Sequence, residues 1–163
     1  MTRSKISKPL EPITLYLNTE INCTKIYNSD NTKILEYQFN NLNLNLSEYC
    51  VMKLISIAHD AGAHGDSIIC FRVKGLSINN ELYRSNDNSP YPVIFANAWK
   101  ANEPAYFDQQ LGGIFLNNQL INNFSFVLSD TLNDINSGVP LGLQFLIGIS
   151  FIPYDRKYSD IEF

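Results

Sequence analysis

The amino-acid sequence predicts an all-β protein, an antiparallel β-sandwich in which short strands alternate with polar turns. Apolar residues recur at every second position along most of the chain, which is the period of a strand with one buried face. Clusters of Asn, Asp, Gly, Ser and Pro separate these runs, and such residues favour turns. No segment has the spacing of a convincing amphipathic helix, so we expect no helices between the strands.

Each run of alternating residues is expected to form one strand. The pattern is clear at 34–39, where Leu35, Tyr37 and Phe39 share one face and polar residues occupy the other. The weakest pattern is that of 112–118. In chain order, the expected strands are 13–17, 34–39, 51–58, 68–76, 92–99, 112–118, 124–130 and 141–153.

The connections between these strands favour one architecture within the sandwich class. The links at 78–91 and 100–111 are long and irregular, whereas an up-and-down barrel has uniformly short hairpins. The chain of 163 residues fits one domain, and no repeat or linker divides it. We therefore predict a single jelly-roll domain of about eight strands over residues 1–163, with residues 1–10 as a flexible amino-terminal arm.

Composition limits the partners of this domain. Charged residues make up 17% of the chain and the net charge is −4. A nucleic-acid surface needs clustered Lys and Arg, and the basic cluster of this chain is confined to Arg3, Lys5 and Lys8 in the arm. We therefore expect no specific nucleic-acid site. The longest apolar run, near 139–153, is too short and too polar to span a membrane.

Asparagine and cysteine usage adds two expectations. Asparagine is abundant, and its short amide bonds the local backbone and tolerates positive φ, so we expect it at turns. The three cysteines, Cys23, Cys50 and Cys70, form no CxxC pair. Their odd number favours reduced thiols in a cytosol-like compartment.

The stretch HDAGAHGD at 59–66 contains both histidines of the chain. Its glycines and aspartates are typical of a turn between two strands. Alternatively, His59, His64 and Asp66 would form the metal site of a small cupin-like protein, a class that shares the jelly-roll fold. The iron site of that class needs another histidine from a distant strand, and the chain has none. We expect a turn, with no metal and no cofactor.

Catalytic motifs are missing from the sequence. The chain has neither a nucleophile elbow nor a glycine-rich phosphate loop, so we do not expect an enzyme. Trp99, with Tyr106 nearby, is the best candidate for a platform that stacks against a sugar. A carbohydrate-binding jelly-roll module is therefore an alternative function, and the competing interpretation of Trp99 is a buried aromatic.

The last predicted strand carries apolar residues on both faces. One face is continuous and is formed by Leu143, Phe145, Ile147, Ile149 and Phe151. The other face includes Leu146 and Ile152, where a strand exposed to solvent would be polar. Either the domain itself or a neighbouring subunit must cover these side chains. We predict an interface formed by Leu146 and Ile152, together with Arg3, Lys5 and Lys8 of the arm.

Several stretches of the chain resemble a known family. FVLSD (126–130), NDINSGVPL (133–141) and LQFLIGISFIP (143–153) follow one another as a strand, a loop with an apolar plug and a long final strand. EYCVMKLISI (48–57), FRVKGL (71–76) and YPVIF (91–95) fit the same style. The whole is similar to small single jelly-roll capsid proteins of large double-stranded DNA viruses, virophages and polinton-like elements. The resemblance implies a penton or minor capsid role without catalytic residues, although such pentons are often longer.

These observations lead to one expected function. The chain is expected to be a viral structural protein, a penton or minor capsid component in the virion capsid, assembled in the host cytoplasm. It would assemble with copies of itself, for example as a closed pentamer, and with other capsid proteins such as a major capsid protein. The carbohydrate-binding module and the cupin-like metalloprotein remain the alternatives.

Overall fold

The computed structural model describes residues 11–59, 67–79, 91–99, 113–130, 134 and 136–154, with only the backbone of 59, 67–68 and 95–99. This part of the chain contains strands and loops and no helix. The strands are β1 (Ile13–Asn18), β2 (Cys23–Tyr27), β3 (Lys33–Phe39), β4 (Leu44–Leu46), β5 (Cys50–His59), β6 (Ser67–Lys74), β7 (Val93–Trp99), β8 (Ile114–Leu116), β9 (Gln119–Ile121), β10 (Phe124–Ser129), β11 (Val139–Pro140) and β12 (Phe145–Pro153).

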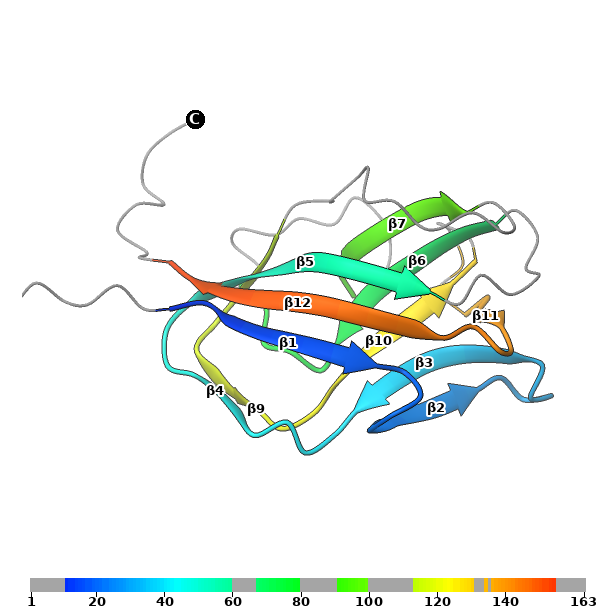
Figure 1. Cartoon of the computed structure of the whole chain (residues 1–163), viewed down its shortest axis with the longest axis horizontal. Helices are drawn as coiled ribbons and strands as arrows, with labels where there is room; N and C mark the ends of the chain where they lie inside the picture. Colours follow the sequence, from blue (N-terminus) through cyan, green and yellow to red (C-terminus); the bar gives the residue numbers. More distant parts are fainter. Residues whose placement is uncertain are drawn as a thin grey trace, which may run out of the picture.

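The strands form two large sheets and one small one, and the named strands all pair antiparallel. The first sheet has the order β1-β12-β5-β8. The second has the order β11-β3-β10-β6-β7, with β2 paired to the outside of β3. Strands β4 and β9 form a separate pair. In Figure 1, β1, β12 and β5 lie across the front and the second sheet lies behind them. The predicted all-β, antiparallel class is confirmed.

The hydrophobic core lies between the two large sheets. The apolar face predicted for the last strand is buried from Leu143 to Phe151, and the alternate residues Phe124, Phe126 and Leu128 of β10 are buried as well. Aromatic rings join the layers: the ring of Phe145 on β12 meets that of Phe71 on β6 edge to face, with centroids 5.0 Å apart. Tyr37 packs on the same ring and donates its hydroxyl hydrogen to the carbonyl oxygen of Leu143 at 2.6 Å. Burial of each such side chain contributes about 1.5–3 kcal/mol.

The number of strands differs from the prediction. Each of the eight predicted runs contains one strand. Strands β2, β4, β9 and β11 are additional, so the prediction of about eight strands was an underestimate. Strands β4, β9 and β11 span two or three residues, which is too short for an alternating pattern to appear in the sequence. β12 begins at Phe145 rather than at 141, because Gly142 takes a positive φ of 86° in the preceding turn.

Asparagine fills the turns as predicted. Asn22, Asn31, Asn41 and Asn43 all have positive φ, between 50° and 59°. The side chain of Asn28 replaces backbone partners in the turn between β2 and β3, where its Oδ1 accepts hydrogen bonds from two backbone N–H groups. The asparagine excess therefore serves turns in this fold.

The second sheet is buried on both faces along β10. Cys70 and Arg72 point away from the core, as the alternation of β6 predicts, yet both are fully buried. The Arg72 guanidinium donates a hydrogen bond from Nη1 to Ser129 Oγ at 2.7 Å. Next to it, the Lys74 ammonium pairs with Glu36 at 2.8 Å, and this hydrogen bond raises the pKa of Lys74.

Candidate functional site

The outer face of the first sheet carries the predicted interface residue Leu146. Its side chain is 45% exposed at the start of β12, between Asn18 of β1 and Ala58 of β5. The second predicted residue, Ile152, lies on the same face near the other end of β12 and is half-buried. The structure therefore leaves an apolar side chain in solvent on this face, as the sequence indicates, but at Leu146 more than at Ile152.

Two further apolar side chains extend this surface. Tyr16 of β1 is 67% exposed and Ile55 of β5 is 40% exposed. Both lean over Gly148 of β12: a Cβ placed there would lie 3.1 Å from a ring carbon of Tyr16 and 3.1 Å from Cγ1 of Ile55. We call Tyr16, Ile55 and Leu146 the apolar strip. The glycine lets the flanking side chains approach each other across β12.

Ile55 of the apolar strip lies at a β-bulge. Gly148 pairs with Ser56 while Ile149 pairs with Leu54, so Ile55 is the extra residue on β5. A bulge of this kind changes the direction of a side chain relative to regular alternation. Ile55 faces outward like Lys53, in regular alternation with the buried Met52 and Leu54. The bulge shifts the alternation after it, so that Ile57 is the next buried residue.

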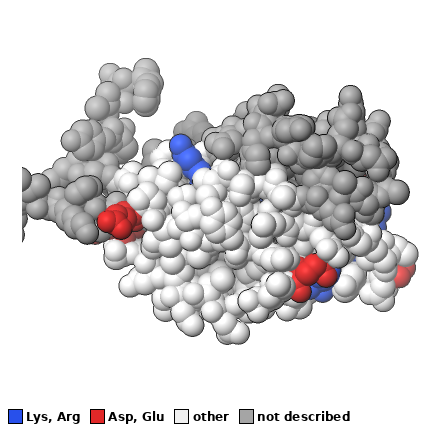
Figure 2. Space-filling model, viewed as in Figure 1, with Lys and Arg blue, Asp and Glu red and all other residues white. Residues whose placement is uncertain are grey.

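The apolar strip lies on a sheet face with very little charge. The four strands of the first sheet contain one lysine, Lys53, and no arginine, aspartate or glutamate. Figure 2 views this face from outside, and the few charged groups lie toward its margins. The second sheet differs, because β3 and β6 contribute to ion pairs of Lys33 and Lys74.

Several predicted site residues are not placed by the structure. Arg3, Lys5, Lys8, His64, Asp66 and Tyr106 lie outside the described residues. The backbones of His59 and Trp99 end β5 and β7, and their side chains are not described. Within the described ranges, no group of three His, Cys, Asp or Glu residues is arranged to hold a metal ion.

The three cysteines are free thiols in the structure, and Cys50 and Cys70 are buried. Burial raises the pKa of the partly exposed Cys23 to about 11 and also raises that of Cys50. A thiol with a raised pKa is a poor nucleophile at neutral pH. Neither Cys23 nor Cys50 therefore has the character of a catalytic cysteine.

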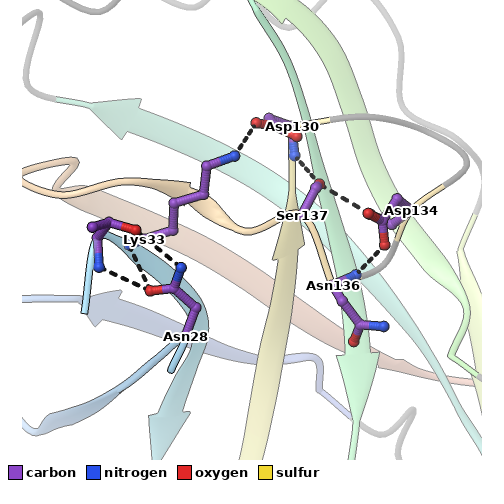
Figure 3. Close-up of polar contacts among 7 residues, drawn as sticks. Asn28, Lys33, Asp130, Asp134, Asn136 and Ser137 are labelled. Atoms are coloured by element: carbon purple, nitrogen blue, oxygen red, sulfur yellow. Dashed lines mark hydrogen bonds and ion pairs between the residues drawn. The ribbon is translucent and has the colours of Figure 1, made fainter. Parts of the chain in front are cut away.

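A second polar cluster ties the β2–β3 turn to the loop after β10 (Figure 3). Lys33 Nζ lies 2.8 Å from Asp130 Oδ2, and the backbone N–H of Asp130 donates to Ser137 Oγ at 3.0 Å. Asp134 accepts from the Ser137 hydroxyl through its carbonyl and from the backbone N–H of Asn136 through its carboxylate. The cluster uses its polar groups on one another, which is typical of a structural network.

The Asp130→Asn variant is expected to be slightly less stable than the wild type at pH 7. Burial alone would raise the pKa of Asp130, but hydrogen bonds from Lys33 and Ser137 outweigh it and lower the pKa. The carboxylate therefore contributes its full stabilisation above pH 3.8, the ordinary pKa of an aspartate. This stabilisation is lost as the pH falls through the lower pKa that Asp130 has in the folded protein. We expect a loss of about 0.2–1 kcal/mol at pH 7, because the pair is partly exposed.

Urea unfolding at pH 7 and over a series from pH 5 to pH 2 measures this effect. The variant should lose less stability than the wild type on acidification. Lys33→Met should cost a similar amount at pH 7, and the double variant should cost less than the sum of the two. The role of this pair would be contradicted if the two losses were additive and if the free energy of unfolding fell with pH in the variants as it does in the wild type.

The described part of the chain contains no helix that is long and apolar enough to cross a membrane. No family model matches the sequence, and neither the curated proteins nor the solved structures include a match to it.

Proposed function

We propose that the two large sheets form a single jelly roll. Eight strands match the predicted runs, and numbered one to eight along the chain they pair as 1-8-3-6 in the first sheet and 2-7-4-5 in the second. This order is that of a jelly roll, in which two Greek keys fold over each other. On this interpretation β2, β4, β9 and β11 are additions to the eight-stranded frame.

We further propose that the chain is a structural protein of a virus shell, a penton or minor capsid component that assembles with copies of itself and with other capsid proteins such as a major capsid protein. The apolar strip on the sparsely charged face of the first sheet is the observation that carries this proposal. Interface cores are depleted in charged residues and enriched in aromatic ones such as Tyr16. The resemblance of the sequence to small jelly-roll capsid proteins favours the same function.

The position of the apolar strip suits a docking surface. Its three residues come from three adjacent strands, so β-sheet hydrogen bonds hold them in fixed relative positions. A rigid surface loses little conformational entropy when it binds. A partner that buries about 800 Å² on each side would cover the strip and the backbone around it.

Association of the purified chain tests this proposal. Analytical ultracentrifugation over a range of concentrations should show oligomers of the wild type. Leu146→Glu places a charge in the apolar strip and is expected to weaken association at least tenfold, which corresponds to about 1.4 kcal/mol. A wild type that stays monomeric at high concentration would contradict the proposal.

Leu120→Glu provides a matched control for the charge. Leu120 is 62% exposed but belongs to β9, outside the first sheet. This variant should associate like the wild type. Equal weakening by the two substitutions would mean that the apolar strip has no special role.

The viral assignment has its own test, which does not depend on the strip. Genes for a major capsid protein and a packaging ATPase should lie next to the gene for this chain, and the chain should be present in purified particles. Its absence from particles would exclude the capsid function, even if the chain forms oligomers.

A further inference from the structure

Strand β1 is an unusual edge of the first sheet. Its partner among the described strands is β12, and its other side is open. Edge strands commonly carry a charge, a proline or a bulge that prevents further pairing. The edge strand β2 of the second sheet contains Lys25 and a register shift, whereas the sequence ITLYLN of β1 has none of these features. β1 is therefore a regular strand without protection against a further strand.

The backbone of β1 directs hydrogen-bonding groups toward this open side. Just beyond β1, the N–H of Thr19 donates to the carbonyl oxygen of Phe145. Along a strand of an antiparallel pair, residues whose backbone groups bond to the partner alternate with residues whose backbone groups point the other way. Because Thr19 bonds to Phe145, the odd-numbered residues of β1 bond to β12. The N–H and C=O groups of Thr14 and Tyr16 consequently point away from the sheet, where an added strand would meet them.

A groove of about 790 Å³ runs along the same edge. It is lined by residues 15–18 of β1, by 21–24 in the next turn and at the start of β2, and by 39–42 at the end of β3 and just after it. None of these residues is charged. Leu17 and Phe39 are buried beneath it, while Tyr16 is exposed at its rim. An extended segment with apolar side chains at alternate positions suits such a site, because it would pair with β1 and fill the groove.

The chain itself contains one terminal segment of this kind. Residues 155–163, DRKYSDIEF, follow the last described residue, and there Ile161 and Phe163 fall on one face of an extended strand. The acidic residues Asp160 and Glu162 fall on the other face. Residues 1–10 contain no two apolar side chains separated by one position. Its alternate apolar positions thus favour the carboxyl-terminal segment over residues 1–10.

The direction of the chain at Tyr154 favours a second copy as the source of this segment. The Tyr154 N–H donates to the carbonyl oxygen of Tyr49 at 2.9 Å, next to β5. Its ring packs edge to face on Phe115 of β8, with centroids 5.4 Å apart. Tyr154 therefore leans toward the β8 edge of the first sheet, opposite β1. To reach its own groove, the segment would have to turn back across the sheet.

We propose that β1 and its groove bind residues 158–163 of a second copy of this chain as an added strand. This inference rests on the proposed self-assembly and names the segment that one copy inserts into the next. The contact is heterologous, since the edge of one copy meets the tail of another, and such contacts form rings when they close.

A labelled peptide of sequence DRKYSDIEF, added to the full chain and followed by fluorescence anisotropy, tests this inference. We expect saturable binding that Tyr16→Pro weakens at least tenfold. The substitution removes the ring and, of the backbone donors of β1, only the outward N–H of residue 16. The pairing with β12 does not use this N–H, so the strand should tolerate proline. Tyr16→Ala is the matched control: it removes the same ring but keeps the N–H, so its loss should be smaller.

Peptide variants keep the test informative if Tyr16→Pro does not fold. Substituting aspartate for Ile161 and Phe163 in the peptide should abolish binding to the wild-type chain, whereas substituting asparagine for its acidic residues should not. Binding that ignores the apolar positions would overturn the inference. The same conclusion would follow if Tyr16→Pro and Tyr16→Ala bound the peptide equally.

Failure of this inference differs from failure of the proposed function. If the peptide does not bind while the chain still associates through Leu146, the inference is wrong and self-assembly stands. If the peptide binds but the full chain stays monomeric, the groove accepts the segment without joining two copies. That result would overturn both the second-copy assignment and the proposed self-assembly.

Discussion

Replacing Phe126 with alanine is expected to lower the free energy of unfolding by about 3–5 kcal/mol. Phe126 is fully buried on β10, in the middle of the second sheet. Its ring meets three others edge to face, with centroid distances of 6.1 Å to Phe39, 5.8 Å to Phe71 and 5.3 Å to Phe124. Truncation loses the burial of the ring and leaves a cavity that the paired strands cannot close. Urea unfolding followed by circular dichroism measures the loss.

Two further variants identify the source of this loss. Phe126→Leu keeps much of the buried volume and should cost clearly less than Phe126→Ala. Leu120→Ala removes an exposed side chain on β9 and should change stability by less than about 0.5 kcal/mol. If Phe126→Ala cost no more than Leu120→Ala, the aromatic cluster would not be the centre of the core.

Replacing Gly138 with alanine is expected to cost about 2–4 kcal/mol, the second largest effect of a single substitution. Gly138 has a φ of +64°, which strains any residue with a Cβ. The added Cβ would also lie 2.9 Å from the carbonyl oxygen of Ile34 and 2.9 Å from Cδ2 of Leu35. The carbonyl belongs to β3, which pairs on both sides, so it cannot move away easily.

Gly142→Ala separates the two contributions. Gly142 also has a positive φ, of +86°, but a Cβ placed there meets no atom within 4 Å. This variant should therefore show the backbone strain alone, about 1–2 kcal/mol. Thermal unfolding of the two variants side by side measures the difference. Equal losses would mean that the contact with Ile34 contributes nothing.

Most of the strands could be predicted because their information is local. The alternation of Phe124, Phe126 and Leu128 marks a buried face without reference to any other part of the chain, and the structure buries all three. The same holds for the apolar face of β12. The short strands β4 and β9 could not be predicted in this way, since three residues stabilised by pairing with each other carry no period of their own.

The candidate site could be predicted only in part. The sequence identifies Leu146 because it is an apolar residue on the face of its strand that would be polar if it were exposed to solvent. The exposure of Tyr16 depends on β1 forming an edge beside β12, which is long-range pairing. The outward direction of Ile55, in contrast, follows the local alternation of β5. The full burial of Arg72 is also non-local, because the alternation of β6 gives its direction but not what covers it.

The pairing of β1 with β12 has a consequence for the synthesis of the protein. Residues 13–18 find their neighbour only when residues 145–153 have left the ribosome, so β1 waits without its partner while the strands between them are made. Contacts between such distant segments also slow folding, because a long loop must close before they form. Until then the uncharged strand β1 stays open to strands of other nascent chains, so wrong pairings on the polysome compete with the native one.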